Sequence, residues 1–118
     1  MPIKLPFRRD GIIELVDLSD ILFLEVSHRT IVIHCSGEDF ETIGDLATQN
    51  ERLGPYGFLR IHRRFLISTS RIRKFTYTYV TLDNGESLPI GKTYRKEVNE
   101  NLKKTFFLNQ KPSYSVRL

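Results

Sequence analysis

The feature that most limits the fold is a succession of short segments with strand-like patterns, each ended by turn residues. Residues 3–8 alternate apolar and polar side chains, as expected when one face of a strand is buried, and Pro6 places that strand at a sheet edge. Asn84-Gly85 separates two such segments and is a strong hairpin signal, because a type I′ turn needs positive φ at both central residues. The segments predicted to be extended are residues 3–8, 12–16, 21–26, 30–35, 40–43, 58–61, 79–82 and 86–90, and residues 65–67 and 72–76 are predicted to be further buried pieces.

Two segments have helical patterns. Asp45 is predicted to cap a helix that runs to about Leu53, where Gly54-Pro55 ends it. Its shared face is predicted to comprise Leu46, Ala47, Asn50 and Leu53. A second helix is predicted from about Thr93 to Phe107. Its apolar stripe, with a spacing of four, is Tyr94, Val98, Leu102 and Phe106.

Together these patterns predict a mainly β domain of eight or nine short strands in small antiparallel sheets, with one short internal helix and one C-terminal helix. The domain is expected to span residues 1–108, and residues 109–118 are expected to form a flexible tail. A chain of 118 residues, 40% of them hydrophobic, can bury one modest core. No apolar run approaches the ~18 residues of a membrane span, no signal peptide is recognisable, and Cys35 has no cysteine partner. We therefore expect a soluble cytoplasmic protein that does not insert into a membrane.

Charge is strongly segregated along the chain. Residues 1–51 contain four Lys/Arg and ten Asp/Glu, whereas residues 52–118 contain fourteen and four. Between Arg52 and Leu82 there are seven basic residues and no carboxylate. Such segregation favours an electrostatic face for an anionic partner, most often nucleic acid, although a solvated basic surface without a partner would have the same composition.

The densest basic cluster is residues 60–74. In an extended segment neighbouring side chains point to opposite faces, so Ile61, Phe65 and Ile67 are expected to anchor inward while Arg63 meets solvent or phosphate. A guanidinium group binds phosphate or a guanine edge through two hydrogen bonds and stays charged at any relevant pH. In the alternative interpretation, one basic residue of this cluster packs inside against a carboxylate such as Glu25; the candidates are Arg60, His62 and Arg64.

Residues 58–68 resemble the signature of LytTR-type DNA-binding domains, in which an Arg-x-His-Arg-Ser core precedes an aromatic residue and an apolar pair. The preceding Ile21-Leu22-Phe23-Leu24-Glu25 is similar to the family's apolar strand that ends in glutamate. Ile72 and then Leu82-x-Asn84-Gly85-x-x-Leu88-Pro89-Ile90-Gly91-Lys92-x-Tyr94 match its hairpin and closing segment. The agreement runs in order from about Ile12 to Leu102.

The resemblance implies small antiparallel sheets that lie across duplex DNA with loops in successive major grooves. It implies contacts from the hairpin tip with His28 and Arg29, from the loop with Arg63, and from Lys92 before the last helix, where Arg95 and Lys96 would contact phosphate. The nearby arginines Arg64 and Arg71 complete the predicted DNA-binding set.

Two positions depart from the family pattern. Gly91-Lys92 stands where the family most often has Ser-Arg, which predicts softer base discrimination because lysine lacks the rigid fork of arginine. Arg64 stands where serine is common, and its extra charge has no obvious destination in the sequence. Many family members carry an N-terminal phosphoacceptor domain, which these residues do not include. Control through expression level, self-association or a membrane-bound inhibitor protein therefore stays open.

The sequence therefore predicts sequence-specific binding of duplex DNA by a bacterial transcriptional regulator, with two copies on short repeated half-sites. One alternative is an RNA-binding β-domain that stacks bases on Tyr77 and Tyr79; another is a protein-interaction module that works through its acidic half. An enzyme is not expected, because no triad, paired-carboxylate or metal constellation is present, and neither is a cofactor. A metal site at His34-Cys35 is not expected, because no second Cys/His pair has ligand spacing. Gly91-Lys92-Thr93 resembles the end of a phosphate-binding loop, but Glu86 stands where that motif requires its first glycine, so no nucleotide site is expected.

Overall fold

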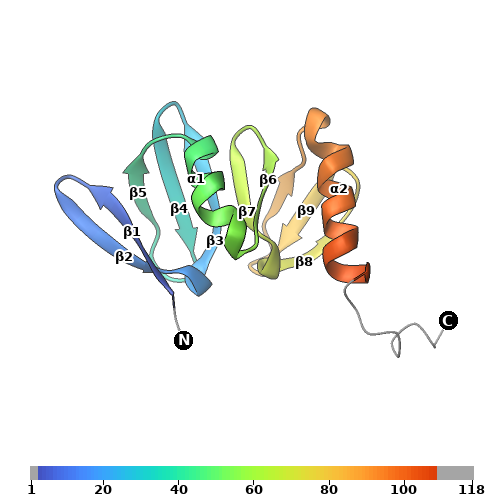
Figure 1. Ribbon diagram of the computed structural model, residues 1–118, viewed down its shortest axis with the longest axis horizontal. Coiled ribbons are helices and arrows are strands. Elements are labelled where there is room, and N and C mark those ends of the chain that lie inside the picture. Colours follow the sequence, from blue (N-terminus) through green and yellow to red (C-terminus); the bar gives the residue numbers. More distant parts are fainter. Residues whose placement is uncertain (1–2, 109–118) are drawn as a thin grey trace.

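The computed structural model describes residues 3–108 as three antiparallel sheets with two α-helices, which confirms the predicted mainly β fold (Figure 1). The predicted tail, residues 109–118, lies outside the described residues. The strands are β1 Lys4–Arg9, β2 Ile12–Asp17, β3 Ile21–Ser27, β4 Thr30–Cys35, β5 Phe40–Ile43, β6 Phe58–His62, β7 Phe65–Ser68, β8 Ile72–Phe75, β9 Tyr79–Leu82 and β10 Ser87–Pro89. The α-helices are α1 Leu46–Leu53 and α2 Arg95–Lys103.

The central sheet has the strand order β5-β4-β3-β7-β6 and separates two hydrophobic cores. Paired residues of β3 and β7 alternate between these cores. Leu24 opposite Leu66 packs into the first core, and Phe23 opposite Ile67 packs into the second. Burial on both faces explains why these two strands are almost continuously apolar instead of alternating.

The first core lies between the sheet, α1 and the β1–β2 hairpin (Figure 1). The Asp45 side chain caps α1 as predicted, accepting a hydrogen bond from the Thr48 N–H at 2.8 Å. The predicted face of α1 was partly wrong, because Ala47 and Asn50 are exposed. The residues that α1 buries are Leu46, Gln49 and Leu53. Gln49 can be buried because its side-chain oxygen accepts a hydrogen bond from Arg52 at 3.1 Å.

The second core lies between the central sheet, a three-stranded sheet of order β10-β9-β8, and α2. All four residues of the predicted helical stripe pack there, Val98 and Leu102 fully and Tyr94 and Phe106 in part. The predicted helix is continuous but changes pitch, with a 3-10 turn at Lys92–Tyr94 before α2 and a π turn at Lys104–Leu108 after it. Among residues 3–108, no helix is both long and apolar enough to cross a membrane.

The β1–β2 hairpin is a separate two-stranded sheet at one end of the molecule (Figure 1). Its turn is Asp10-Gly11, and both residues have positive φ (49° and 78°), as a type I′ turn requires. Phe7 and Val16 pack into the first core, and the Thr42 hydroxyl of β5 donates to the Arg8 carbonyl at 2.7 Å. The hairpin is therefore fixed to the central sheet although its strands pair only with each other.

Cys35, at the end of β4, is half-buried and packs against the first core. Burial, followed by the nearby charges of Asp39 and Asp20, raises the pKa of its thiol to about 11. Within residues 3–108, no group of three or more His, Cys, Asp or Glu side chains is arranged to hold a metal ion.

Two isoleucines of the central sheet test this packing. Ile67 is fully buried in the second core, whereas Ile43 of β5 is 67% exposed. We expect Ile67→Ala to lower the free energy of unfolding by about 2–5 kcal/mol, through lost burial and the cavity left behind. Ile43→Ala should change it by less than about 0.5 kcal/mol. Urea unfolding followed by circular dichroism measures both, and equal losses would contradict the two-core arrangement.

Cys35 supplies a second test. With a thiol pKa of about 11, only a small fraction of Cys35 is thiolate at pH 8, and the thiolate is the reactive form. Alkylation by iodoacetamide should therefore be much slower in the folded protein than in urea, and should accelerate as the pH rises toward 11. Mass spectrometry of timed samples measures the rate. Equal rates in the folded and unfolded protein would contradict the raised pKa.

Candidate nucleic-acid interface

Three basic segments meet at one edge of the molecule, the upper edge in Figure 1. Strand β7 is antiparallel to both β3 and β6, so β3 and β6 run in the same direction and the turns that follow them emerge at the same edge. The segment that leads into α2 joins this edge through a hydrogen bond from the Gly91 N–H to the Ile61 carbonyl at 2.8 Å. The sequence order of the strands alone does not bring these segments together.

The first segment is the β3–β4 turn. Ser27 pairs with Thr30, so His28 and Arg29 form a two-residue connection, and both side chains are exposed. His28 has a φ of 58°, in the left-handed region that side chains rarely adopt. The Gly44 N–H donates to the Arg29 carbonyl at 2.8 Å, which ties the turn to the connection between β5 and α1.

The second segment is the β6–β7 turn, Arg63-Arg64. The Arg60 guanidinium group donates to the carbonyls of His62 (3.3 Å) and Arg63 (2.7 Å). His62 Nδ1 accepts a hydrogen bond from the Arg64 N–H at 3.1 Å. The exposed Arg63 side chain makes no hydrogen bond or ion pair with any residue from 3 to 108, so its donors are available to a ligand.

His62 supports this turn in its neutral form. Burial, followed by the charges of Arg63, Arg64 and Arg60, lowers the pKa of His62 below its ordinary value. A neutral imidazole keeps a lone pair on one ring nitrogen, which Nδ1 needs in order to accept from Arg64.

The alternative that one basic residue packs inside against Glu25 is met only in part: Arg64 pairs with Glu25, but its side chain is exposed. Arg64 Nη2 lies 3.2 Å from Glu25 Oε2, and its guanidinium Nε donates to the Val26 carbonyl. Arg60 instead binds the two turn carbonyls, and His62 contacts no carboxylate among the described residues.

The third segment contains Gly91, Lys92 and the start of α2. A side chain at position 91 would begin 3.0 Å from the Tyr94 ring and 3.4 Å from the His62 ring, so glycine allows this close approach to β6. Lys92 and Lys96 are exposed, and Arg95 is half-buried with its Nε donating to the Ile90 carbonyl at 3.4 Å. Glycine in place of the family's usual serine at position 91 is thus explained by its close packing against Tyr94 and His62.

Arg71 does not join the other predicted residues. It lies in a 3-10 turn, Thr69–Arg71, at the end of β7 opposite the β6–β7 turn. Its guanidinium group donates to the Ser19 carbonyl and lies 3.7 Å from the Asp83 carboxylate. The other seven of the eight predicted residues lie in the three segments of this edge: His28, Arg29, Arg63, Arg64, Lys92, Arg95 and Lys96.

Two supporting residues are not among the predicted site residues. Arg60 holds the carbonyls of the β6–β7 turn, and Gly91 allows the close approach to β6. The spacing of three between Arg60 and Arg63 could have indicated the role of Arg60, because a long side chain near the end of β6 can reach the carbonyls of the turn that follows.

Acidic groups gather away from this edge. A cleft of about 380 Å³ is lined by the carboxylates of Glu14, Asp17, Asp20, Glu38 and Asp39. Asp20 precedes β3, and Glu38 and Asp39 follow β4, so these three lie at the end of the central sheet opposite the β3–β4 turn. Part of the charge segregation of the sequence is thus also a segregation in space, although Arg9 lines the same cleft.

Comparison with known proteins identifies relatives of this chain. The family model of the LytTr DNA-binding domain matches residues 11–103. The chain is 30% identical over 104 residues to the transcriptional regulatory protein LytR of Staphylococcus aureus (strain N315), covering 84% of this chain and 42% of that protein. It is 31% identical over 97 residues to the sensory transduction protein LytR of Staphylococcus saprophyticus, covering 78% of this chain and 38% of that protein. The chain thus spans well under half the length of these curated relatives.

A solved structure, a LytTr DNA-binding domain from Bacillus cereus, superposes with a TM-score of 0.73 at 19% identity, covering 85% of this chain and 96% of that chain. This likeness concerns the fold, and it agrees with the three-sheet arrangement of Figure 1. Because the family model matches most of the sequence, the chain belongs to the LytTr DNA-binding domain family.

Proposed function

We propose that this protein binds duplex DNA in a sequence-specific manner as a bacterial transcriptional regulator. The observation that carries the proposal is the meeting of three basic segments at one edge, each fixed to a neighbour by a backbone hydrogen bond. Membership in the LytTr family and relatives named as transcriptional regulators support it. The acidic cleft away from that edge would favour one orientation of approach to a polyanion.

In this proposal Arg63 and Lys92 read bases, and His28 and Arg29 enter a neighbouring major groove. The major groove is about 12 Å wide and admits a two-stranded ribbon such as the β3–β4 or β6–β7 hairpin. A guanidinium or ammonium group at its tip can donate to guanine O6 and N7. Arg63 suits this role because its donors are not used inside the protein among residues 3–108.

Arg95 and Lys96 are assigned to phosphate. They begin α2, directly after the 3-10 turn at Lys92–Tyr94, where the positive end of the helix dipole favours an anion. Phosphate contacts fix the register of the protein on the duplex without carrying sequence information. Arg71 is left out of the proposed interface, because its guanidinium group is engaged at the opposite edge.

Two copies on repeated half-sites are part of the proposal. One domain offers three short contacts, and each base contact discriminates by only ~1–3 kcal/mol. Two linked binding events on one duplex would raise both affinity and specificity beyond what a single copy reaches.

The RNA alternative receives less support. A single-strand binder needs successive exposed aromatic rings as a stacking platform. Tyr77 is 57% exposed, but Tyr79 is half-buried within β9, opposite Pro89. A comparison of the affinity for duplex DNA with the affinity for single strands of the same sequence distinguishes these two hypotheses directly.

The base-reading roles can be tested on a duplex selected from a random pool by the wild-type protein. Arg63→Ala and Lys92→Ala should each lose about five- to 150-fold of the preference for that duplex over a variant with a changed base, the equivalent of ~1–3 kcal/mol. Lys96→Ala should weaken binding to all duplexes alike and reduce the salt slope by about 0.9. Fluorescence anisotropy at two salt concentrations measures both effects.

Lys103→Ala is the matched control, because Lys103 is an exposed lysine in the last turn of α2, away from the basic edge. It should leave preference and salt slope unchanged. If Lys103→Ala and Lys92→Ala weaken binding equally without loss of base preference, binding is nonspecific and the proposed function is wrong.

The number of copies can be tested on the selected duplex. With both repeats intact we expect two proteins per duplex, and with one repeat scrambled we expect one protein and much weaker binding. Analytical ultracentrifugation of the complexes counts the copies. Saturation at one protein per intact duplex with nanomolar affinity would contradict the two-copy proposal.

A further inference from the structure

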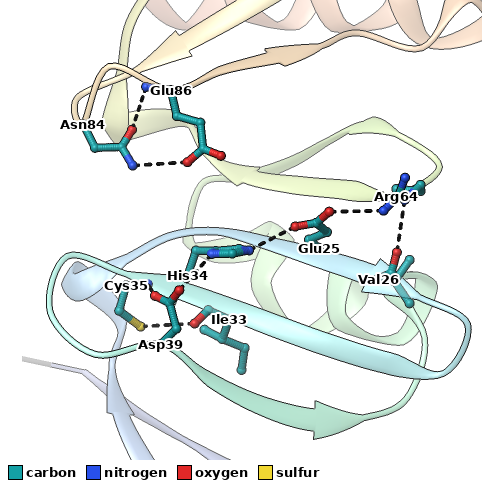
Figure 2. Close-up of polar contacts among 9 residues, drawn as sticks. All are labelled: Glu25, Val26, Ile33, His34, Cys35, Asp39, Arg64, Asn84 and Glu86. Carbon is teal, nitrogen blue, oxygen red and sulfur yellow. Dashed lines mark hydrogen bonds and ion pairs between the residues drawn. The ribbon is translucent and has the colours of Figure 1, made fainter.

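A chain of polar side chains crosses the central sheet toward the β6–β7 turn (Figure 2). Glu25 Oε2 lies 3.2 Å from Arg64 Nη2, and Glu25 Oε1 lies 3.1 Å from His34 Nε2. The other ring nitrogen of His34, Nδ1, lies 3.0 Å from Asp39 Oδ2. One carboxylate therefore joins the turn of the basic edge to β4 and to the loop after β4.

The strand register explains this arrangement. Glu25 pairs with Val32 of β4 and with Phe65 of β7, while Phe23 pairs with His34, so Glu25 and His34 share a sheet face. The His34 ring stacks on Phe23 with centroids 4.2 Å apart and planes 20° apart. The position of the imidazole is thus set by packing as well as by its two carboxylate contacts.

Arg64 is also attached to β3 by its backbone. The Val26 N–H donates to the Arg64 carbonyl at 3.0 Å, and Arg64 Nε donates to the Val26 carbonyl at 3.3 Å (Figure 2). The contact with Glu25 completes a three-point attachment. Its neighbour Arg63 has no such attachment among residues 3–108. Adjacent arginines of one turn therefore have different environments.

We propose that Arg64 and Glu25 are positioning residues for the base-reading turn: Arg64 straps the β6–β7 turn to β3, and Glu25, held by His34, orients the strap. This inference rests on the proposed function. It reassigns Arg64 from a DNA contact to a support for Arg63. It also gives the extra charge at position 64 a destination, the Glu25 carboxylate.

Two simpler roles, phosphate contact by Arg64 and repulsion of DNA by Glu25, predict different results for the same substitutions. If Arg64 contacted phosphate, Arg64→Ala would reduce the salt slope by about 0.9. As a strap, Arg64→Ala leaves the salt slope unchanged but lowers the base preference that Arg63 provides. If Glu25 acted only by repelling DNA, Glu25→Ala would tighten binding to every duplex. As a positioning residue, Glu25→Ala instead lowers base preference.

The experiment uses the full chain and the duplex selected by the wild type, with Glu25→Ala, Arg64→Ala and the double variant. We expect each single variant to lose about tenfold in base preference, the loss of one hydrogen bond to a charged group, and the double variant to lose no more than either one. Neither substitution should add to the loss caused by Arg63→Ala. Additive losses, or a reduced salt slope in Arg64→Ala, would overturn the proposal.

Glu41→Ala is the matched control. Glu41 of β5 lies in the same cross-strand row as Glu25, opposite Val32, is exposed, and forms no ion pair with the described residues. It removes the same charge from the same sheet face and should leave base preference unchanged. An equal loss in Glu41→Ala would show that net charge, not the strap, is responsible, and would overturn the proposal.

A measurement without DNA separates the strap from the proposed function. Amide hydrogen exchange at Val26 reports its hydrogen bond to the Arg64 carbonyl. We expect exchange there to accelerate about tenfold in Glu25→Ala and Arg64→Ala, but not in Glu41→Ala. Unchanged exchange would overturn the strap even if DNA binding is confirmed. A wild-type protein that selects no duplex would overturn the proposed function and the DNA role of the strap, while accelerated exchange would still establish the strap.

Discussion

The burial of β3 and β7 on both faces is the constraint on which the rest of the structure depends. Leu24 and Leu66 pack toward α1 and the first hairpin, while Phe23 and Ile67 pack toward the second sheet and α2. Two cores thus share one pair of strands, and neither layer can shift without disturbing the other. Because interiors are close-packed, the strand ends are held at defined positions, and the turns at those ends are therefore held in place as well.

The same scaffold gives some basic side chains partners inside the protein and leaves others exposed. Arg60 satisfies backbone carbonyls, Arg64 meets a carboxylate, and Arg71 is engaged at the far edge. Arg63 and Lys92 are left exposed at the basic edge. Net charge alone therefore overstates the number of groups available to a partner, since a guanidinium group that is already hydrogen-bonded gains less from a phosphate.

The sequence predicted the local elements better than their assembly. Strand order along the chain, the Asp45 cap and the stripe of α2 follow from patterns within a few residues, and the structure confirms them. The face of α1 was predicted in part, because Gln49 is buried by virtue of a partner, Arg52, that periodicity does not reveal. The location of Arg71 depends on the edge of the sheet at which the C-terminal end of β7 lies. The partner of Glu25 depends on the strand order in the sheet. Both are non-local facts.

The hydrogen bonds that fix the basic edge have a consequence for how such a protein can change over generations. The Gly91, Gly44 and Val26 N–H groups donate to the carbonyls of Ile61, Arg29 and Arg64, so main-chain atoms hold all three segments. Substitutions at His28 or Lys92 would remove none of these bonds. New side chains can therefore replace those at the tips while the frame that presents them stays intact. Under the proposed function, one architecture could thus acquire new recognition sequences in single mutational steps.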